Sequence, residues 1–169
     1  MTSRMLVTLA VLALYTATAS SHGAPDTTAL IGSWKLVSYE DRDSSGASVY
    51  PYGKAPAGLL IYDATGHMAI QIMTTPPPDV ASDDWDLFTV KEKVALYDAY
   101  TAYFGRYEVD SGRKVVIHLA EADLSRLYIG RHEERHYQLT GDRLILTETW
   151  AQSGKTWNGT RVFQRIKSR

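Results

Sequence analysis

The sequence predicts an all-β fold, an eight-stranded antiparallel barrel with one inserted helix. Eight segments are rich in alternating, β-branched or aromatic residues, and most are joined by short turns. One stretch, residues 89–104, has a helical period instead. Gly32-Ser33-Trp34 opens the first strand and puts a large aromatic at an inward position, where it can fill one end of a barrel.

The strands follow one another closely along the chain. We expect them over residues 30–41, 58–62, 67–73, 106–109, 114–120, 131–139, 143–150 and 156–166. In the first strand, alternation puts Ser38 and Glu40 on the face of Trp34, and Tyr39 on the other face. An up-and-down barrel is the economical arrangement, because closure removes exposed strand edges.

The single helix has recognisable start and stop signals. Thr89 can cap its first turn, and Glu92, three residues later, completes a capping box. Val94, Tyr97, Thr101 and Phe104 share one face, which extends the expected helix to Phe104, and Gly105 ends it.

The segment before the helix has a different composition. Pro76-Pro77-Pro78 cannot join a strand ladder, and four aspartates surround Trp85. Long loops inside compact domains are usually functional or disordered. We expect residues 76–86 to lie over the open end of the barrel, and the sequence leaves open whether they close over a ligand.

The first twenty residues predict a secretory signal peptide. One basic residue, Arg4, precedes the apolar run Met5–Ala17, and small residues follow it. An uncleaved anchor is the alternative, but the run is short for a membrane span. The remaining residues form one domain, with the barrel over residues 30–167. Asn158-Gly159-Thr160 is a glycosylation sequon, so we expect a sugar on Asn158 of a secreted protein.

Composition narrows the classes of function. The formal net charge is −1, and losing Arg4 with the signal peptide lowers it by one more. A nucleic-acid-binding protein needs a basic face, and a polybasic membrane patch is also missing. The chain contains no cysteine, which excludes disulfides and thiol catalysis. Its eleven tyrosines and four tryptophans suit a core or a small-molecule pocket.

Five blocks of the chain carry a family pattern. They are Leu30–Glu40, Gly58–Tyr62, Ala102–Val109, Gly141–Leu146 and Phe163–Ile166, and they span nearly the whole mature chain. Together they resemble the small lipocalin-like domain family of bacterial and fungal proteins. The block Tyr-Phe-Gly-Arg-Tyr-Glu-Val is the most specific of them. The resemblance implies the calycin-type barrel, with Arg165 of the last strand stacked on Trp34 at the closed end.

The same resemblance implies a function. Some fungal relatives act as cyclases in natural-product pathways, among them secreted, glycosylated hetero-Diels–Alderases that join a tropolone-derived quinone methide to a cyclic sesquiterpene. The signal peptide, the sequon and the aromatic richness of this chain are similar to theirs. A shared fold does not give a shared function, so the residues must carry the argument.

Alternation predicts which polar side chains face the interior. The later strands put these residues inward: Arg131, Glu133, Arg135, Tyr137, His118, Glu148, Trp150, Trp157, Arg161 and Arg165. A buried arginine needs a partner. Arg135 therefore either pairs with Glu133 or Glu148 as scaffold, or points at a ligand oxygen.

A second group has two interpretations as well. Tyr62, Gln71, Tyr103, His118 and Trp150 are either core residues with one hydrogen-bond partner each, or hydrogen-bond donors on an apolar wall around a ligand. In the second interpretation Tyr62, Gln71, His118 and Arg135 act on a conjugated carbonyl, with His118 as general acid or base where water must leave. Tyr103, Trp150 and Trp157 bind the substrate.

Other chemistries find little support. His132 and His136 are expected to lie more than about 10 Å apart along a strand, and we interpret them as surface residues. No metal site and no cofactor are therefore expected. Glu40, Glu133 and Glu148 could form the carboxylate pair of a glycoside hydrolase, although nothing sets their separation. The serines lack a nucleophile elbow.

The sequence thus favours a secreted cyclase of the hetero-Diels–Alder type, which joins a reactive enone or quinone methide to an apolar terpene alkene. The alternative is a non-catalytic carrier of a small hydrophobic molecule. Small hydrophobic substrates are the expected partners. Whether two barrels meet in a homodimer is left open.

Overall fold

The computed structural model describes residues 27–167, and the expected signal peptide lies outside them. Its strands are β1 (Gly32–Asp43), β2 (Ser48–Val49), β3 (Ala57–Tyr62), β4 (His67–Met73), β5 (Tyr100–Asp110), β6 (Val115–Asp123), β7 (His132–Thr140), β8 (Arg143–Gln152) and β9 (Lys155–Arg165). Its helices are the α-helix α1 (Val90–Asp98) and the short 3₁₀ helices η1 (Thr27–Leu30), η2 (Trp85–Leu87) and η3 (Arg126–Tyr128). None of these helices is long and apolar enough to cross a membrane.

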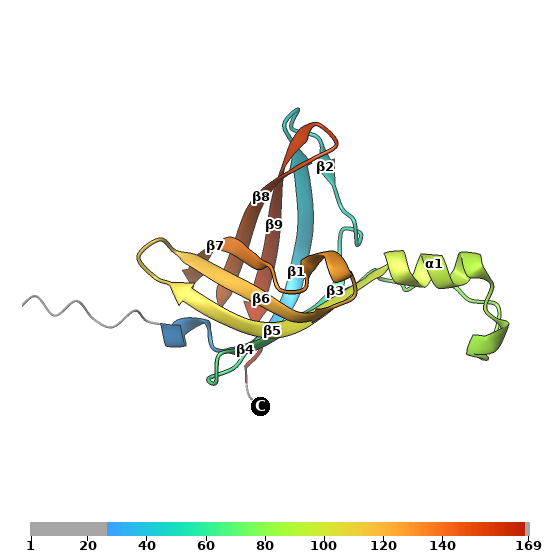
Figure 1. Ribbon diagram of the computed structural model, residues 1–169, viewed down its shortest axis with the longest axis horizontal. Coiled ribbons are helices and arrows are strands. Elements are labelled where there is room, and N and C mark those ends of the chain that lie inside the picture. Colours follow the sequence, from blue (N-terminus) through green and yellow to red (C-terminus); the bar gives the residue numbers. More distant parts are fainter. Residues whose placement is uncertain (1–26, 168–169) are drawn as a thin grey trace, which may run out of the picture.

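The strands form a closed antiparallel barrel (Figure 1). Each strand from β3 to β9 pairs with its neighbour in sequence, and β1 pairs with both β3 and β9. The two-residue strand β2 adds only a short edge to β1. The expected eight-stranded barrel with one α-helix is confirmed for the described residues. The pairing of residues between neighbouring strands shows which residues lie at each end of the barrel. Gly32, Tyr62 and Arg165 lie toward one end, and Asp43, Met73 and Lys155 toward the other.

The first of these ends is closed by Trp34 and Arg165. The Arg165 guanidinium carbon lies 4.0 Å from the centre of the Trp34 ring. The same guanidinium donates hydrogen bonds of 2.6 Å to the carbonyls of Ala29 and Ile31, which fastens η1 across the opening. Gly32 has φ of 138°, and a Cβ there would lie 2.8 Å from Arg165 Nη1. The Gly-x-Trp motif is therefore explained by the space that the arginine needs.

The helix is shorter than its sequence pattern suggests. The capping box between Thr89 and Glu92 is present, but α1 ends at Asp98. The expected continuation to Phe104 is wrong, because Tyr100–Phe104 are mostly aromatic or β-branched and pair with β4 instead. Gly105, expected as the stop of the helix, lies inside β5 at a bulge against β6.

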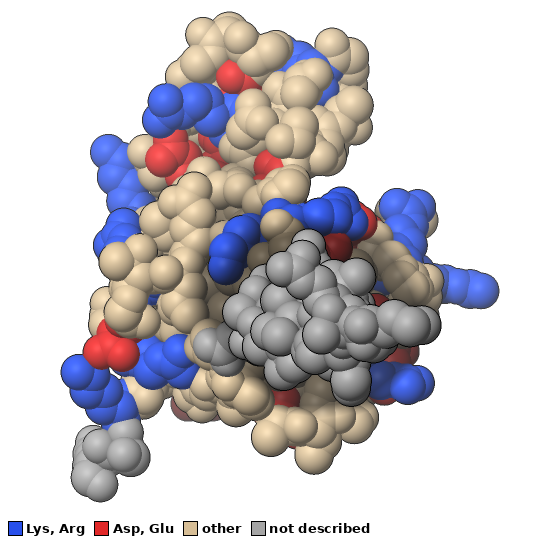
Figure 2. Space-filling view, turned by 90° about the vertical axis from the view of Figure 1, so that its left-hand side faces the viewer, with Lys and Arg blue, Asp and Glu red and all other residues tan. Residues whose placement is uncertain are grey.

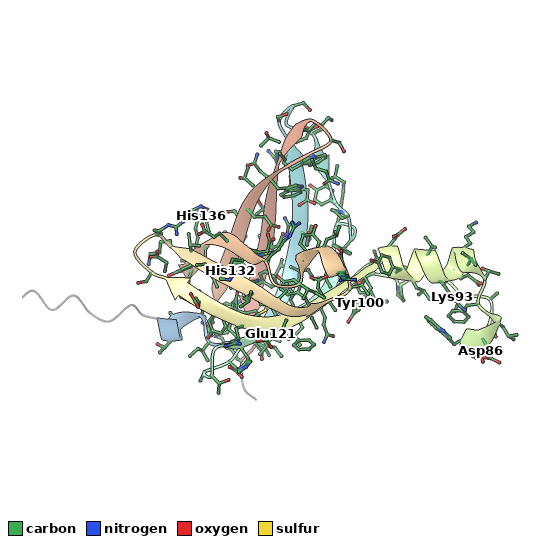
Figure 3. The ribbon with its side chains drawn as sticks, viewed as in Figure 1. Asp86, Lys93, Tyr100, Glu121, His132 and His136 are labelled. Atoms are coloured by element: carbon green, nitrogen blue, oxygen red, sulfur yellow. The ribbon has the colours of Figure 1, made fainter. Side chains whose placement is uncertain are left out.

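The connection from β4 to β5 forms a projecting arm, residues 74–99. Figure 1 shows α1 and η2 extending away from the barrel, and α1 buries none of its residues. Figure 3 places Asp86 and Lys93 far out on this arm and Tyr100 at its base. The expectation that residues 76–86 lie over the open end is therefore corrected. The arm is rooted at that end but points away from it, with Trp85 packed on Phe88 and exposed to solvent.

A change at the closed end tests how the barrel is held shut. Arg165→Met removes two charge-assisted hydrogen bonds and the cation above Trp34, and we expect it to lower the free energy of unfolding by about 2–4 kcal/mol. The matched control is Arg106→Met, which removes an exposed ion pair to Glu121 and should cost at most about 1 kcal/mol. Urea unfolding measures both losses. Equal losses would show that Arg165 is an ordinary surface arginine.

Candidate functional site

Much of the interior is apolar. It holds one core cluster, formed by Leu30, Trp34, Leu36, Leu60, Tyr62, Met68, Ile70, Ile72, Val116, Tyr137, Leu144, Leu146 and Phe163. These residues come from β1, β3, β4 and β6 to β9, and from η1. Their alternation in sequence matches the pleat, so each strand contributes its apolar face inward. The polar groups of the interior lie against this cluster.

Three polar side chains meet against the cluster in a hydrogen-bonded relay. The Tyr62 hydroxyl lies 2.6 Å from His118 Nε2, and the Tyr103 hydroxyl lies 2.8 Å from His118 Nδ1. The three residues come from β3, β5 and β6, so the closed sheet is what brings them together. Tyr62 and His118 are 1% exposed, whereas Tyr103 is only partly buried.

Burial keeps this relay uncharged. It lowers the pKa of His118 well below the ordinary value of 6.5, and the nearby Arg135 charge lowers it further. Burial also raises the pKa values of Tyr62 and Tyr103, while the Arg135 charge opposes both rises. His118 is thus a neutral imidazole near neutral pH. Its expected role as general acid or base stays a prediction.

A charged network lies next to the relay. Arg161 contacts Asp41 at 2.8 Å and Glu148 at 2.9 Å, and Arg135 contacts Glu148 at 3.3 Å. Two positive and two negative charges therefore balance. Arg135 also donates to the backbone carbonyl of Glu133 at 3.2 Å. The predicted pairing of Arg135 with Glu148 is therefore confirmed. Glu133 binds Arg135 through its backbone carbonyl and not through its carboxylate.

Arg161 is held especially closely. Its guanidinium lies 3.6 Å from the centre of the Tyr39 ring and donates to the Tyr39 hydroxyl at 2.5 Å. A Cβ on Gly159 would lie 2.1 Å from Arg161 Nη1, so only glycine leaves room for this arrangement. Burial raises the pKa of Asp41, and the Arg161 charge opposes that rise.

The sequence did not predict Tyr39 and Asp41 as interior residues. A register shift between Leu36 and Ser38 on β1 inserts a bulge, which reverses the faces beyond it. Ser38 and Glu40, expected inside with Trp34, are consequently displaced from that face, and Glu40 instead binds Arg42 and Ser48 at the surface. No signal in the sequence marks this bulge.

Aromatic side chains line the end opposite Trp34. Trp150 and Trp157 form a cross-strand pair on β8 and β9, with ring centres 6.3 Å apart and planes 14° apart. Tyr39 and Tyr52 meet edge to face at 5.0 Å. The two tryptophans are partly buried, and the side chains of Arg161 and Lys155 lie over the Trp150 and Trp157 rings, respectively.

Some expected site residues lie elsewhere. Gln71 is exposed on the outer face of β4, because its neighbours Ile70 and Ile72 face inward, and it is separated from the relay. His132 and His136 are exposed on β7 (Figure 3). Between residues 27 and 167, no three His, Asp or Glu side chains gather so as to hold a metal ion. Asn158 is exposed on β9, where its side-chain oxygen accepts a hydrogen bond from Thr149.

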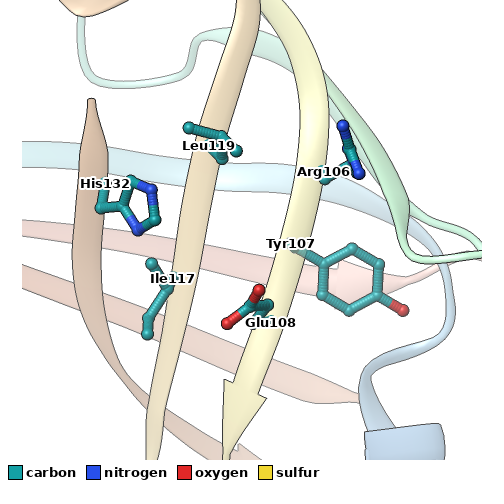
Figure 4. Close-up of a pocket in the computed structure, with 6 residues that line it drawn as sticks. All are labelled: Arg106, Tyr107, Glu108, Ile117, Leu119 and His132. Atoms are coloured by element: carbon teal, nitrogen blue, oxygen red, sulfur yellow. The ribbon is translucent and has the colours of Figure 1, made fainter. Parts of the chain in front are cut away.

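Two surface hollows lie on the outer wall of the barrel. A small one of about 60 Å³ is lined by Arg106, Tyr107, Glu108, Ile117, Leu119 and His132 (Figure 4). A groove of about 270 Å³ runs along the outer faces of β4 and β5, beside Phe104 and Leu124. Basic and acidic side chains are interspersed on the face shown in Figure 2, so neither kind of charge forms a continuous patch in this view.

The neutrality of His118 predicts how stability depends on pH. The unfolded chain takes up a proton at His118 near pH 6.5, and the folded protein does not. The free energy of unfolding should therefore fall as pH falls below 6.5, by up to about 1.4 kcal/mol per pH unit from this residue. His118→Gln cannot titrate and should lack this component in urea unfolding at pH 5 to 7. Identical slopes for the two proteins would contradict a neutral buried His118.

Among the comparisons with known proteins, a family model identifies the family of the chain. No curated protein matches the chain. A solved lipocalin, whose expression is activated by cell transformation with the myc oncogene, shares 12% identity with it. That match covers 86% of this chain and 76% of the other, with a TM-score of 0.34. The family model of the lipocalin-like domain matches residues 31–166, nearly all of the described chain. The protein therefore belongs to the lipocalin-like domain family.

Proposed function

We propose that the protein is a secreted pericyclase that holds two small apolar partners in its barrel and joins them by a hetero-Diels–Alder cycloaddition. The lipocalin-like fold supports a barrel that binds hydrophobic ligands. The observation that carries the finer proposal is the uncharged Tyr62–His118–Tyr103 relay at the apolar core cluster. One partner is a reactive enone or tropolone-type quinone methide, and the other is a terpene alkene.

This reaction matches what the interior offers. The oxygen and the terminal carbon of the heterodiene each form a bond to one carbon of the alkene, and no proton or electron leaves. No strong nucleophile or acid is needed. Neutral hydrogen-bond donors suit it, because a donor to the carbonyl lowers the energy of the electron-poor partner as its oxygen gains charge.

Two physical contributions would lower the activation free energy of the cycloaddition. Holding the partners in near-attack geometry can contribute roughly 7–11 kcal/mol in favourable cases. One preorganised hydrogen bond to the developing oxygen charge commonly adds about 2.7–4 kcal/mol. The Trp150 and Trp157 rings can stack on a flat unsaturated ring at the open end. The buried side chains of the core cluster exclude water from the deeper part of the barrel.

A carrier is the second candidate, and the same apolar interior favours it. A carrier binds one stable ligand per barrel and leaves the distribution of products unchanged. The charge-balanced Arg135–Glu148–Arg161 network suits either function, because it leaves no unpaired charge to repel an apolar guest. Secretion and a sugar on Asn158 belong to the proposal in both cases.

The decisive experiment uses the protein recovered from the medium of a eukaryotic secretory host. It is incubated with a quinone-methide precursor and a cyclic sesquiterpene alkene, and the adducts are separated by chiral chromatography. We expect many turnovers per protein and a single enantiomer. Racemic adduct at the uncatalysed rate, together with stoichiometric binding of either partner, would identify a carrier instead.

The arm offers an independent test. Replacing residues 76–97 by a short turn should leave the melting temperature nearly unchanged, because α1 buries none of its residues. Turnover should fall by a larger factor, because the arm is rooted at the open end of the barrel and carries exposed apolar side chains such as Val90. Calorimetry and the cycloaddition assay measure the two effects. A large loss of melting temperature with full activity would contradict the expected role.

A further inference from the structure

We infer that Tyr62 and His118 fix the direction of the relay, so that the Tyr103 hydroxyl keeps its proton for an acceptor oxygen of the bound ligand. This inference rests on the proposed binding of a small ligand in the barrel. It assigns Tyr103 as the group that touches the ligand, and Tyr62 and His118 as positioning residues that act through it.

The first step is the chemistry of the imidazole. Both ring nitrogens of His118 have a tyrosine hydroxyl within hydrogen-bond distance. A neutral imidazole carries one N–H donor and one acceptor nitrogen. One tyrosine therefore donates to the ring, and the other accepts from it. The tyrosine that accepts retains its own hydroxyl proton.

The second step decides which tyrosine donates. Tyr62 is 1% exposed, and within residues 27–167 His118 Nε2 is the hydrogen-bond partner of its hydroxyl. If Nε2 carried the proton, the Tyr62 proton would be buried without an acceptor, at a cost of about 1–3 kcal/mol. Tyr62 therefore donates to Nε2. The other nitrogen, Nδ1, then carries the proton and donates it to the Tyr103 oxygen.

The third step concerns the proton left on Tyr103. Tyr103 packs at the margin of the core cluster and is only partly buried, whereas Tyr62 and His118 are almost fully buried, so Tyr103 is the member of the relay nearest to an entering ligand. The Arg135 guanidinium carbon lies 6.0 Å from the centre of its ring. Arg135 is itself held by Glu148 and by the Glu133 carbonyl. Its positive charge favours an electron-rich ligand oxygen on this side of the interior.

The arrangement therefore selects for one class of ligand. A small, flat, mostly apolar molecule with a ketone, enone or quinone-methide oxygen can accept the Tyr103 proton. A molecule of the same shape without an acceptor oxygen leaves that proton unpaired and binds more weakly. The relay is built to recognise an acceptor, and it would distinguish a carbonyl compound from the matching hydrocarbon.

The direction of the relay is tested on the ligand-free protein. Nitrogen-15 labelling of histidine and long-range proton–nitrogen correlation spectra report which nitrogen of His118 carries the proton. We expect a neutral ring protonated at Nδ1 from pH 6 to 8. A ring protonated at Nε2, or a doubly protonated ring, overturns the inference. Because this measurement uses the unaltered protein, no variant has to fold for it.

The consequence for binding is tested with two fluorescent probes. One is a dimethylaminonaphthyl ketone, whose emission reports hydrogen bonding to its carbonyl, and the other is the same naphthalene without the keto group. We expect Tyr103→Phe to weaken ketone binding about tenfold, the equivalent of one hydrogen bond, and to leave the hydrocarbon unaffected. The matched control is Tyr107→Phe, whose hydroxyl donates to the Asp63 carbonyl, and it should not separate the two probes.

Tyr62→Phe examines the positioning role. Without the Tyr62 donor, Nε2 no longer has to be the acceptor, so Tyr103 can donate to the ring. We expect a changed nitrogen-15 pattern for His118 and a weaker preference for the ketone, although Tyr103 is intact. Equal weakening of both probes, with the tautomer unchanged, would mean that Tyr62 only fills space and would overturn the relay.

The outcomes separate the inference from the proposed function. If both probes bind and Tyr103→Phe affects them equally, ligand binding stands and the inference fails. If neither probe binds to the unaltered protein, the proposed binding of small apolar ligands fails and takes the ligand-directed role of Tyr103 with it.

Discussion

The contact between Arg165 and Trp34 is the constraint on which the rest of the barrel depends. It joins the last strand to the first at the point where the sheet has to close, and it uses one guanidinium for two purposes. The cation covers the indole face, and its N–H groups satisfy the carbonyls of Ala29 and Ile31. With β9 fixed against β1 in this way, the inward residues of β6 and β8 face those of β3 and β1 across a shared interior. The relay and the charged network both require that closure.

The interior shows two ways of burying polar groups at low cost. The charged network pairs Arg135 and Arg161 with Glu148 and Asp41, so that no charge stands alone. The relay avoids charge altogether, because burial keeps its three members neutral. In both cases the interior holds polar groups without leaving a buried charge unpaired.

Much of this could be predicted from alternation alone. The inward positions of His118, Glu148 and Arg161 agree with the simple alternation of side chains along their strands. The outward position of Gln71 follows on the same ground, since Ile70 and Ile72 flank it in a regular strand. The bulge in β1 could not be predicted, because a single inserted residue depends on pairing with a distant strand. The end of α1 was similarly misplaced, since tertiary pairing of β5 with β4 outweighs a local helical period.

The arm has a consequence for the connectivity of the chain. Both ends of the barrel sequence meet at its closed end, where Ile166 donates a backbone hydrogen bond of 2.8 Å to Ser33. The arm lies between two strands that pair along their length, from His67 with Arg106 to Met73 with Tyr100. A cut within the arm would thus leave every ladder of the barrel in place. The same fold is open to circular permutation, with the present ends linked and new termini opened between Pro76 and Asp98.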